Sequence, residues 1–265
     1  VMALREEMGL NDNFFVQYLR YIKNALHGDF GKSYRNNISV FDEILARFPN
    51  TLRLAFWGIV ISGSIGIPVG VISAVKQYSV IDHISTVAAL LMTSLPSFWL
   101  GLMMMLLFAN KLGWLPATGA DTWKNFIMPS VAVAATSLAT LIRMTRSTML
   151  EVIRQDYIRT ARAKGASEKT VVFKHALRNA LLPVVTVIGI NFGSLLGGAM
   201  IAETVFAIPG LGSLMIASVR AKDTPCVMAS VLFVAIAVGL TNLLVDILYA
   251  YIDPRIKSQY VGGKR

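Results

Sequence analysis

The sequence has little charge for its length and few residues that bind metals. Of its 265 residues, 15% are Asp, Glu, Lys or Arg, whereas a soluble domain contains about 25%. The single cysteine, Cys226, excludes an intrachain disulfide framework and a cysteine-based zinc site. The three histidines, at positions 27, 83 and 175, are too scattered to indicate a metal cluster. These shortages argue against a disulfide-stapled domain and predict no metal site.

The sequence also lacks a nucleotide-binding loop. The nearest match is Gly31-Lys32-Ser33, but a phosphate-binding loop needs a glycine at position 26, where the chain has Leu26. No other catalytic constellation stands out. The chain is therefore predicted to be a non-enzyme that binds no cofactor itself.

Apolar sequence is abundant: 55% of the residues are hydrophobic, and five stretches of 17 to 27 residues carry no charged side chain. They predict spans at about 52–75, 84–109, 126–142, 180–202 and 224–246, the second kinked at Pro96. A helix of 22 residues extends about 33 Å, enough for a hydrocarbon core of about 30 Å. One such stretch fits a buried soluble helix, but five predict an all-α, multi-pass membrane protein.

The basic residues predict the orientation. Residues 143–179 contain nine Lys or Arg and three Asp or Glu, so the positive-inside rule places this segment in the cytoplasm. Alternation then places 1–47, 111–125 and 203–223 outside and the tail 253–265 inside. The net charge of +10 does not indicate nucleic acid, because the surplus is concentrated in a loop between membrane spans. Membrane lipid is the expected surrounding.

The cytoplasmic segment 143–179 is predicted to form two short helices. The first covers about Ser147 to Lys164 and ends at Gly165, and Ser167 caps the second. Such an element suits docking against another protein. It equally suits a basic surface helix held by anionic lipid headgroups.

Three further groups of residues are candidates for roles in the membrane. A stripe of small residues predicts close helix packing in the fourth span: Gly189, Gly193 and Gly197. Polar residues in the spans are candidates for a translocation path, or else bond their own helix backbone: Ser94, Ser97, Asn191 and Ser194. An external turn is either a gate or a plain connection: Pro209, Gly210 and Gly212.

The stretch DYIRTARAKGASEKTVVFKHALRNALLPVV, residues 156–185, resembles the cytoplasmic signature of ABC-importer permeases of the oligopeptide, dipeptide and nickel family. Four more segments resemble the same family in order: HGDFGKSY at 27–34, FPNTLRLAF at 48–56, AETVFAIPGLGSLM at 202–215 and DILYAYIDPRI at 246–256. Arg159-Thr160-Ala161 replaces the Glu-Ala-Ala of the general importer signature. The family's first membrane helix has no counterpart here, so the N-terminus is expected to be truncated.

The resemblance implies a type I ABC importer transmembrane domain over 48–252. It implies an ATPase-docking role for one set of loop residues: Arg159, Thr160, Ala161, Arg162, Lys164, Gly165, Ala166 and Ser167. The implied partners are a second homologous permease, two ATP-binding cassette subunits that hold ATP and magnesium, and an extracytoplasmic substrate-binding protein. The implied location is a bacterial or archaeal cytoplasmic membrane.

The expected substrates are di- or oligopeptides, with nickel or glutathione as alternatives in the same family. A membrane scaffold or passive channel is the alternative from another class. An ion-coupled carrier is disfavoured, because none of the five spans carries a carboxylate or histidine at mid-membrane.

Overall fold

The computed structural model describes residues 12–252, and these residues are helical apart from short connections and one isolated bridge between Lys32 and Ser39. The first half contains α2 (Phe14–Leu26), α3 (Val40–Val75), α4 (Val80–Ser94), α5 (Ser97–Met104), the π-helical η1 (Met105–Lys111) and the 3-10 helix η2 (Trp123–Phe126). The second half contains α6 (Ile127–Ile153), α7 (Asp156–Ala163), α8 (Glu168–Thr170), the π-helical η3 (Val171–Ala176), α9 (Leu177–Gly198), α10 (Met200–Val205), α11 (Leu211–Arg220) and α12 (Thr224–Ile252).

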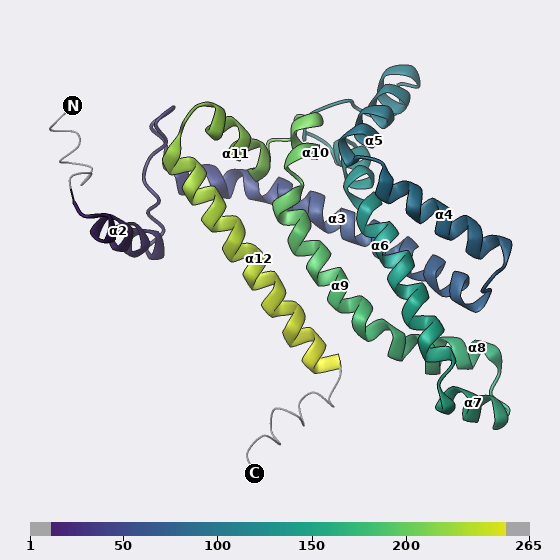
Figure 1. Ribbon diagram of the computed structural model, residues 1–265. Helices are drawn as coiled ribbons and strands as arrows, with labels where there is room; N and C mark the ends of the chain where they lie inside the picture. Colours follow the sequence, from purple (N-terminus) through teal and green to yellow (C-terminus); the bar gives the residue numbers. More distant parts are fainter. Residues whose placement is uncertain (1–11, 253–265) are drawn as a thin grey trace, which may run out of the picture.

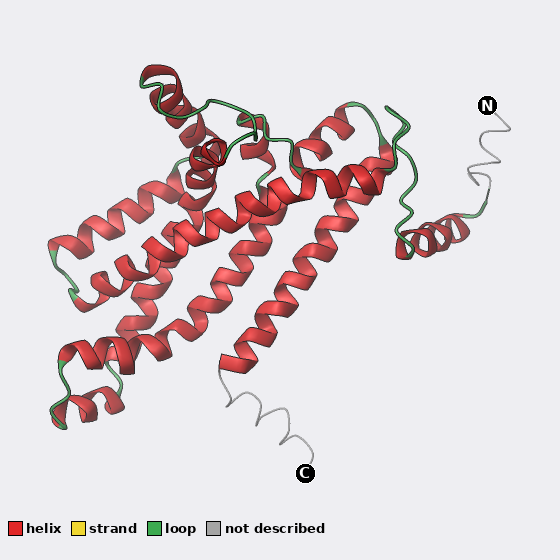
Figure 2. Cartoon of the chain, turned by 180° about the vertical axis from the view of Figure 1, so that it is seen from behind, coloured by secondary structure: helices red, strands yellow, loops and turns green. Residues whose placement is uncertain are grey.

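Long apolar helices form a tilted bundle around α6 (Figures 1 and 2). Helix α3 packs along α6, and α9 lies between α6 and α12. In the most apolar part of α6, 78% of the residues are buried, against 11% in α12. Helix α6 is therefore the centre of the bundle, and α12 presents most of its surface outward. Below, the end of the bundle that carries α7 and α8 is called the loop end, and the end that carries α10 and α11 the turn end.

Helices α3 and α6 approach closely because α3 places small residues in the contact. A Cβ atom on Gly70 would lie 2.6 Å from Thr145 Cβ and 2.8 Å from the Ile142 carbonyl oxygen. A Cβ atom on Gly66 would lie 3.0 Å from Leu141 Cβ. Between apolar helices in a membrane, such close van der Waals contact is a main source of association.

The second predicted span is not one kinked helix. It is a pair, α4 and α5–η1, bent by 99°. Leu95 and Pro96 between them are both extended, with ψ of 126° and 133°. Because a proline disfavours the helical conformation of the residue before it, Leu95 leaves the helix and the span breaks completely. The described part of the chain thus has four helices long and apolar enough to cross a membrane, or five if this pair counts as one span.

Several helices extend beyond the predicted membrane spans. Helix α3 starts at Val40, inside the region predicted as an external extension, and α6 continues to Ile153, well past the predicted end at 142. The second helix of the cytoplasmic segment is not short, because α8, η3 and α9 follow one another without a break. The predicted tail 253–265 and residues 1–11 of the predicted N-terminal region lie outside the described residues.

The segment between α2 and α3 is tied to the start of α12. Ser33 Oγ and the Tyr34 backbone N–H both donate to the carboxylate of Asp223, which directly precedes α12. Phe30 is buried with Val40 and Cys226 in the same apolar cluster. These contacts hold α2 at the turn end of the bundle.

Candidate functional site

The α7–α8 connection at the loop end is a compact turn built around Gly165. The Gly165 N–H donates to the Arg162 carbonyl oxygen (2.9 Å), and the Ala166 N–H donates to the Ala161 carbonyl oxygen (3.2 Å). This pair of bonds is the Schellman arrangement, which needs a left-handed residue, and Gly165 has φ +79°. Ser167 then caps α8 by accepting a bond from the Thr170 N–H. The predicted helix stop and N-cap are confirmed.

An ion pair closes this turn on its outer side. Arg162 Nε lies 2.7 Å from Glu168 Oε1, and Arg162 Nη2 lies 3.3 Å from Glu168 Oε2. The pair is solvent-exposed, so it contributes little to stability, but its two-point geometry fixes the direction of both side chains. Six predicted docking residues are exposed around this turn: Arg159, Thr160, Arg162, Lys164, Gly165 and Ser167.

The inner side of α7 is packed against the bundle. Ile158 is fully buried in a cluster that includes Val71 of α3, Met149 of α6 and Val171 of η3. The two remaining predicted docking residues are half-buried against the same cluster: Ala161 and Ala166. The loop therefore has a basic outer face and an apolar inner face, and the inner face contacts the ends of three spans.

The first helix of the cytoplasmic segment differs from its prediction. Residues 147–153 belong to α6, and a break at Arg154 and Gln155 separates them from α7. Gln155 is extended, with ψ of 150°. The periodicity of apolar residues continues through this point, so the sequence alone does not reveal the break.

A second polar cluster at the loop end joins three helices. Asp82 of α4 is buried and accepts bonds from Arg146 Nε (2.6 Å) and Arg146 Nη2 (2.8 Å) of α6 and from the hydroxyl of Ser73 on α3. Its carboxylate also accepts a bond from the Tyr78 N–H (2.9 Å). Sequence reasoning missed this cluster. Asp82 borders a charge-free stretch, and Arg146 lies at the end of another span. This pair of opposite charges could have indicated an ion pair between the two helices.

A third polar cluster organises the turn end. Glu203 of α10 has no exposed surface, and its carboxylate accepts bonds from the Thr51 hydroxyl (2.6 Å), the Ser213 N–H (2.9 Å) and the Gly212 N–H. The Thr51 hydroxyl in turn accepts from the Leu211 N–H (2.8 Å). Glu203 and Thr51 thereby satisfy the free N–H groups of the first turn of α11. Burial raises the pKa of the Glu203 carboxyl, while these hydrogen bonds oppose the rise.

The glycines of the predicted external turn are needed for this arrangement. A Cβ atom on Gly210 would lie 2.2 Å from the carboxyl carbon of Glu203, and one on Gly212 would lie 2.5 Å from Met200 Cα. The Pro209 carbonyl oxygen accepts a bond from Asn50 of α3. The turn is therefore closely packed against α3 and α10. Glu203 lies at the centre of this turn.

The predicted glycine stripe of α9 lies against α12. A Cβ atom on Gly189 would lie 2.2 Å from Val245 Cγ2, whereas Cβ atoms on Gly193 and Gly197 would meet their nearest neighbours at 3.3 Å and 3.7 Å. The contact is thus tightest at Gly189 and loosens toward Gly197.

Gly189→Ala is expected to destabilise the fold by about 1–3 kcal/mol, as overpacking usually does. The free energy of unfolding in mixed micelles measures this. Gly197→Ala is the matched control, since its Cβ has room, and should have little effect. Adding Val245→Ala to Gly189→Ala should restore most of the loss, and a double variant as unstable as the single one would contradict the contact.

The family described as "Binding-protein-dependent transport system inner membrane component" matches residues 66–258 of the chain. The chain belongs to this family. It is 42% identical to the dipeptide transport system permease of Alkalihalophilus pseudofirmus, with 97% of this chain and 86% of that protein covered. It is 43% identical to the glutathione permease of Escherichia coli (97% and 84% covered) and to the oligopeptide permease of Bacillus subtilis (95% and 83% covered).

Solved structures show the same fold at lower identity. An inward-facing conformation of the MetNI methionine ABC transporter matches with a TM-score of 0.67 at 20% identity, covering 80% of this chain and 96% of that chain. An amino acid ABC transporter matches with a TM-score of 0.56 at 15% identity, covering 81% and 94%. The fold is therefore that of an ABC-importer transmembrane domain, and the chain is a multi-pass permease of the binding-protein-dependent family.

The four path candidates of this permease lie on three helices. Ser94 ends α4, exposed, and donates to the Leu90 carbonyl oxygen of its own helix. Ser97 begins α5, across the break. On α9, Asn191 is half-buried with an unpaired amide nitrogen, and Ser194 is exposed. No hydrogen bond joins any two of these four within residues 12–252.

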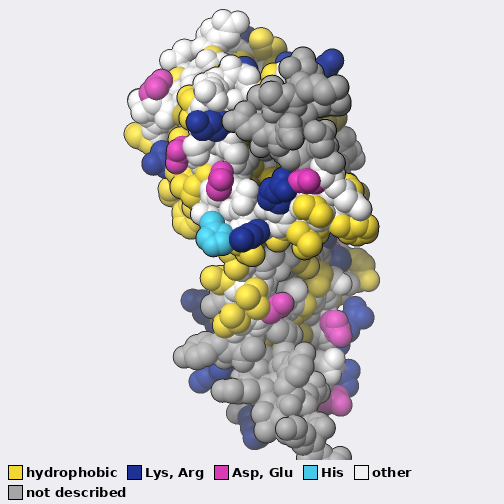
Figure 3. Space-filling model, turned by 90° about the vertical axis from the view of Figure 1, so that its left-hand side faces the viewer, with side chains coloured by type: hydrophobic (Ala, Val, Ile, Leu, Met, Phe, Trp, Pro, Cys, Tyr) yellow, Lys and Arg dark blue, Asp and Glu magenta, His cyan; other side chains and the backbone are white. Residues whose placement is uncertain are grey.

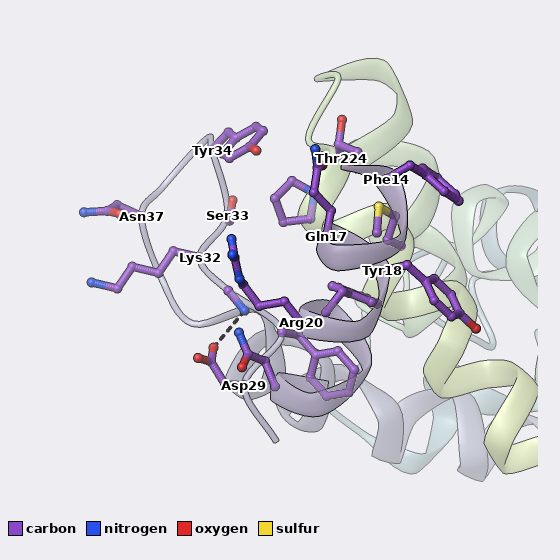
Figure 4. Close-up of a pocket in the computed structure, with 16 residues that line it drawn as sticks. Phe14, Gln17, Tyr18, Arg20, Asp29, Lys32, Ser33, Tyr34, Asn37 and Thr224 are labelled. Atoms are coloured by element: carbon purple, nitrogen blue, oxygen red, sulfur yellow. Dashed lines mark hydrogen bonds between the residues drawn. The ribbon is translucent and has the colours of Figure 1, made fainter. Parts of the chain in front are cut away.

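A pocket of about 830 Å³ lies at the turn end, and none of the predicted site residues lines it (Figure 4). It is bounded by α2, by the segment 29–37 and by the first turn of α12. Residues 12–252 contain no group of three His, Cys, Asp or Glu side chains that could hold a metal ion.

Proposed function

We propose that this chain forms a peptide translocation path together with a second permease, and that ATP-driven motion enters it through the α7–α8 connection. The observation that supports this most is the two-sided loop: a basic exposed face around Gly165, and Ile158 buried between the ends of three spans. The identity of 42–43% to dipeptide and oligopeptide permeases supports the substrate class.

In the proposed mechanism the loop end faces the cytoplasm and the turn end faces outward. An external binding protein delivers the peptide at the turn end. Two ATP-binding cassette subunits, which hold ATP and magnesium, close against each other, and one of them grips the loop. The exposed residues Arg159, Arg162 and Lys164 pair with acidic groups on that subunit. The small residues at 165 and 166 let the two backbones approach closely.

Glutathione is the second candidate substrate, because the Escherichia coli glutathione permease is as similar to this chain as the peptide permeases are. Glutathione is itself a short peptide, so one kind of path suits both. Competition between labelled dipeptide and glutathione for uptake by the reconstituted importer separates the two.

Site-directed photocrosslinking tests the docking role. A crosslinking amino acid at Ala163, which is exposed on α7, is expected to give an adduct with an ATP-binding cassette subunit in intact membranes. The same group at the exposed Leu112, near the turn end, is the control and should give no such adduct. Adducts with lipid alone at position 163 would favour the headgroup-bound alternative, and the absence of any ATPase in the purified complex would favour a scaffold or passive channel.

A further inference from the structure

Helix α2 has an apolar face that the rest of the described chain leaves largely uncovered, with only Ile22 partly buried. Phe15, Leu19, Ile22 and Leu26 recur at helical spacing along one side of the helix. Phe15 is 70% exposed, Leu19 65% and Leu26 82%, and no residue of α2 is fully buried. An apolar stripe of this kind in water is unfavourable, so a partner is expected to cover it.

The contacts of α2 with the rest of the chain determine which side of the helix faces outward. Tyr21 and Ala25 pack against the buried cluster that contains Phe30, Val40 and Leu211. The polar side, opposite the apolar stripe, carries Gln17, Arg20 and Asn24, whereas Lys23 flanks the stripe. Arg20 extends toward the segment 29–37 in the close-up (Figure 4). The apolar stripe therefore faces away from both the cluster and this polar side.

The position of α2 favours lipid as the covering partner. The helix lies to the side of the bundle, next to the turn end of α12, and not over the turn itself (Figures 1 and 2). Figure 3 views this side, where hydrophobic side chains lie among both basic and acidic ones. Tyr18 lines the same pocket as Met228 of α12. Met228 is 44% exposed, and the outward apolar surface of α12 continues from it to Val231, which is 50% exposed. Exposed side chains of α2 and of a membrane span thus face the same pocket and lie near each other.

We propose that α2 lies in the membrane interface at the turn end, with Phe15, Leu19, Ile22 and Leu26 among the acyl chains. Lys23, which flanks the stripe, reaches the headgroup region through its long apolar stem, while Arg20 pairs with Asp12. A strongly amphipathic helix with basic residues on its polar side and aromatic and aliphatic residues on the other is typical of helices that lie in a bilayer surface. The segment 27–39 connects α2 to α3. An α2 held in the interface would therefore restrict sideways movement of the turn end of α3.

Spin labels report directly on the surroundings of each side of α2. The buried Cys226 is replaced by serine, and single cysteines at Phe15, Leu19 and Asn24 are labelled in the complete importer reconstituted into lipid nanodiscs. Relaxation by oxygen, which concentrates among acyl chains, is compared with relaxation by a water-soluble nickel chelate. Labels at Phe15 and Leu19 are expected to respond more to oxygen, and the label at Asn24, exposed on the polar side, more to the chelate.

Two results would overturn the proposal. A label at Leu19 that responds mainly to the chelate would mean that the stripe faces water. A label there that is immobilised and shielded from both reagents would mean that another protein, either the second permease or the binding protein, covers it. The proposal does not rest on the docking role of the α7–α8 connection: either role can fail while the other holds.

Discussion

Gly165→Asp is expected to abolish ATP-driven peptide uptake while the chain still inserts and folds. Within this chain there is room for a side chain at position 165, because a Cβ atom there would meet nothing within 4 Å. Aspartate is also among the residues that best tolerate a left-handed backbone, and Gly165 has φ +79°. A loss of uptake must therefore come from a contact outside this chain. The measurement is uptake of labelled dipeptide into proteoliposomes, with co-purified ATPase quantified alongside.

The chain offers a matched control for this variant. Gly113 near the turn end is also left-handed, with φ +64°, and a Cβ atom there also meets nothing within 4 Å. Gly113→Asp thus introduces the same side chain and the same backbone strain far from α7. Uptake should survive in it. Equal loss in both variants would point to backbone strain, and normal uptake by Gly165→Asp would remove the docking role.

Glu203→Ala is expected to lower the free energy of unfolding by about 5 kcal/mol. The substitution leaves the Thr51 hydroxyl and the N–H groups of Gly212 and Ser213 without an acceptor in a buried site. Each unpaired buried donor costs about 1–3 kcal/mol. The start of α11 also loses the negative group at its N-terminus, which favours the helix.

Two variants define how this result is to be read. Glu203→Gln keeps one acceptor oxygen and should lose less stability than alanine. Glu151→Ala removes an exposed glutamate of α6 and should change the free energy of unfolding by no more than about 0.5 kcal/mol, as surface substitutions usually do. Unfolding in mixed micelles compares all three. A Glu203→Ala variant as stable as Glu151→Ala would contradict the role of Glu203 as the cap of α11.

The sequence predicts the long helices well because membrane spans need many consecutive apolar residues. It predicts the ends of the helices poorly for the same reason. Charged residues indicate where a membrane span ends, but not where its helix ends. Helix α6 continues past Arg143 to Ile153, because its last turns pack in the cluster with Ile158 and Val171. The break at Leu95 and Pro96 was read as a kink, since proline alone does not distinguish the two.

The loop turn was predictable because its geometry is local. Gly165 and Ser167 satisfy neighbouring backbone groups, and such bonds depend on residues a few positions apart. The clusters around Asp82 and Glu203 were not predictable in this way. Asp82 meets Arg146 across 64 positions, and Glu203 meets Thr51 across 152. Only the packed bundle brings these pairs together.

The small residues of α3 also indicate close helix packing, which the sequence analysis did not predict. Gly58, Ser62, Gly66 and Gly70 repeat every four positions, the same pattern that was noticed on α9. Three of them face crowded neighbours in the structure. The sequence therefore also contained the signal for the close contact between α3 and α6.

The burial of Ile158 has a mechanical consequence. Exposing this side chain to water would cost about 1.5–3 kcal/mol of free energy. Helix α7 therefore resists moving independently of the bundle. A displacement of α7 is instead expected to be transmitted to α3, α6 and η3, because Ile158 is buried in one cluster with residues of all three. Helix α7 is therefore expected to move together with the bundle and not separately from it.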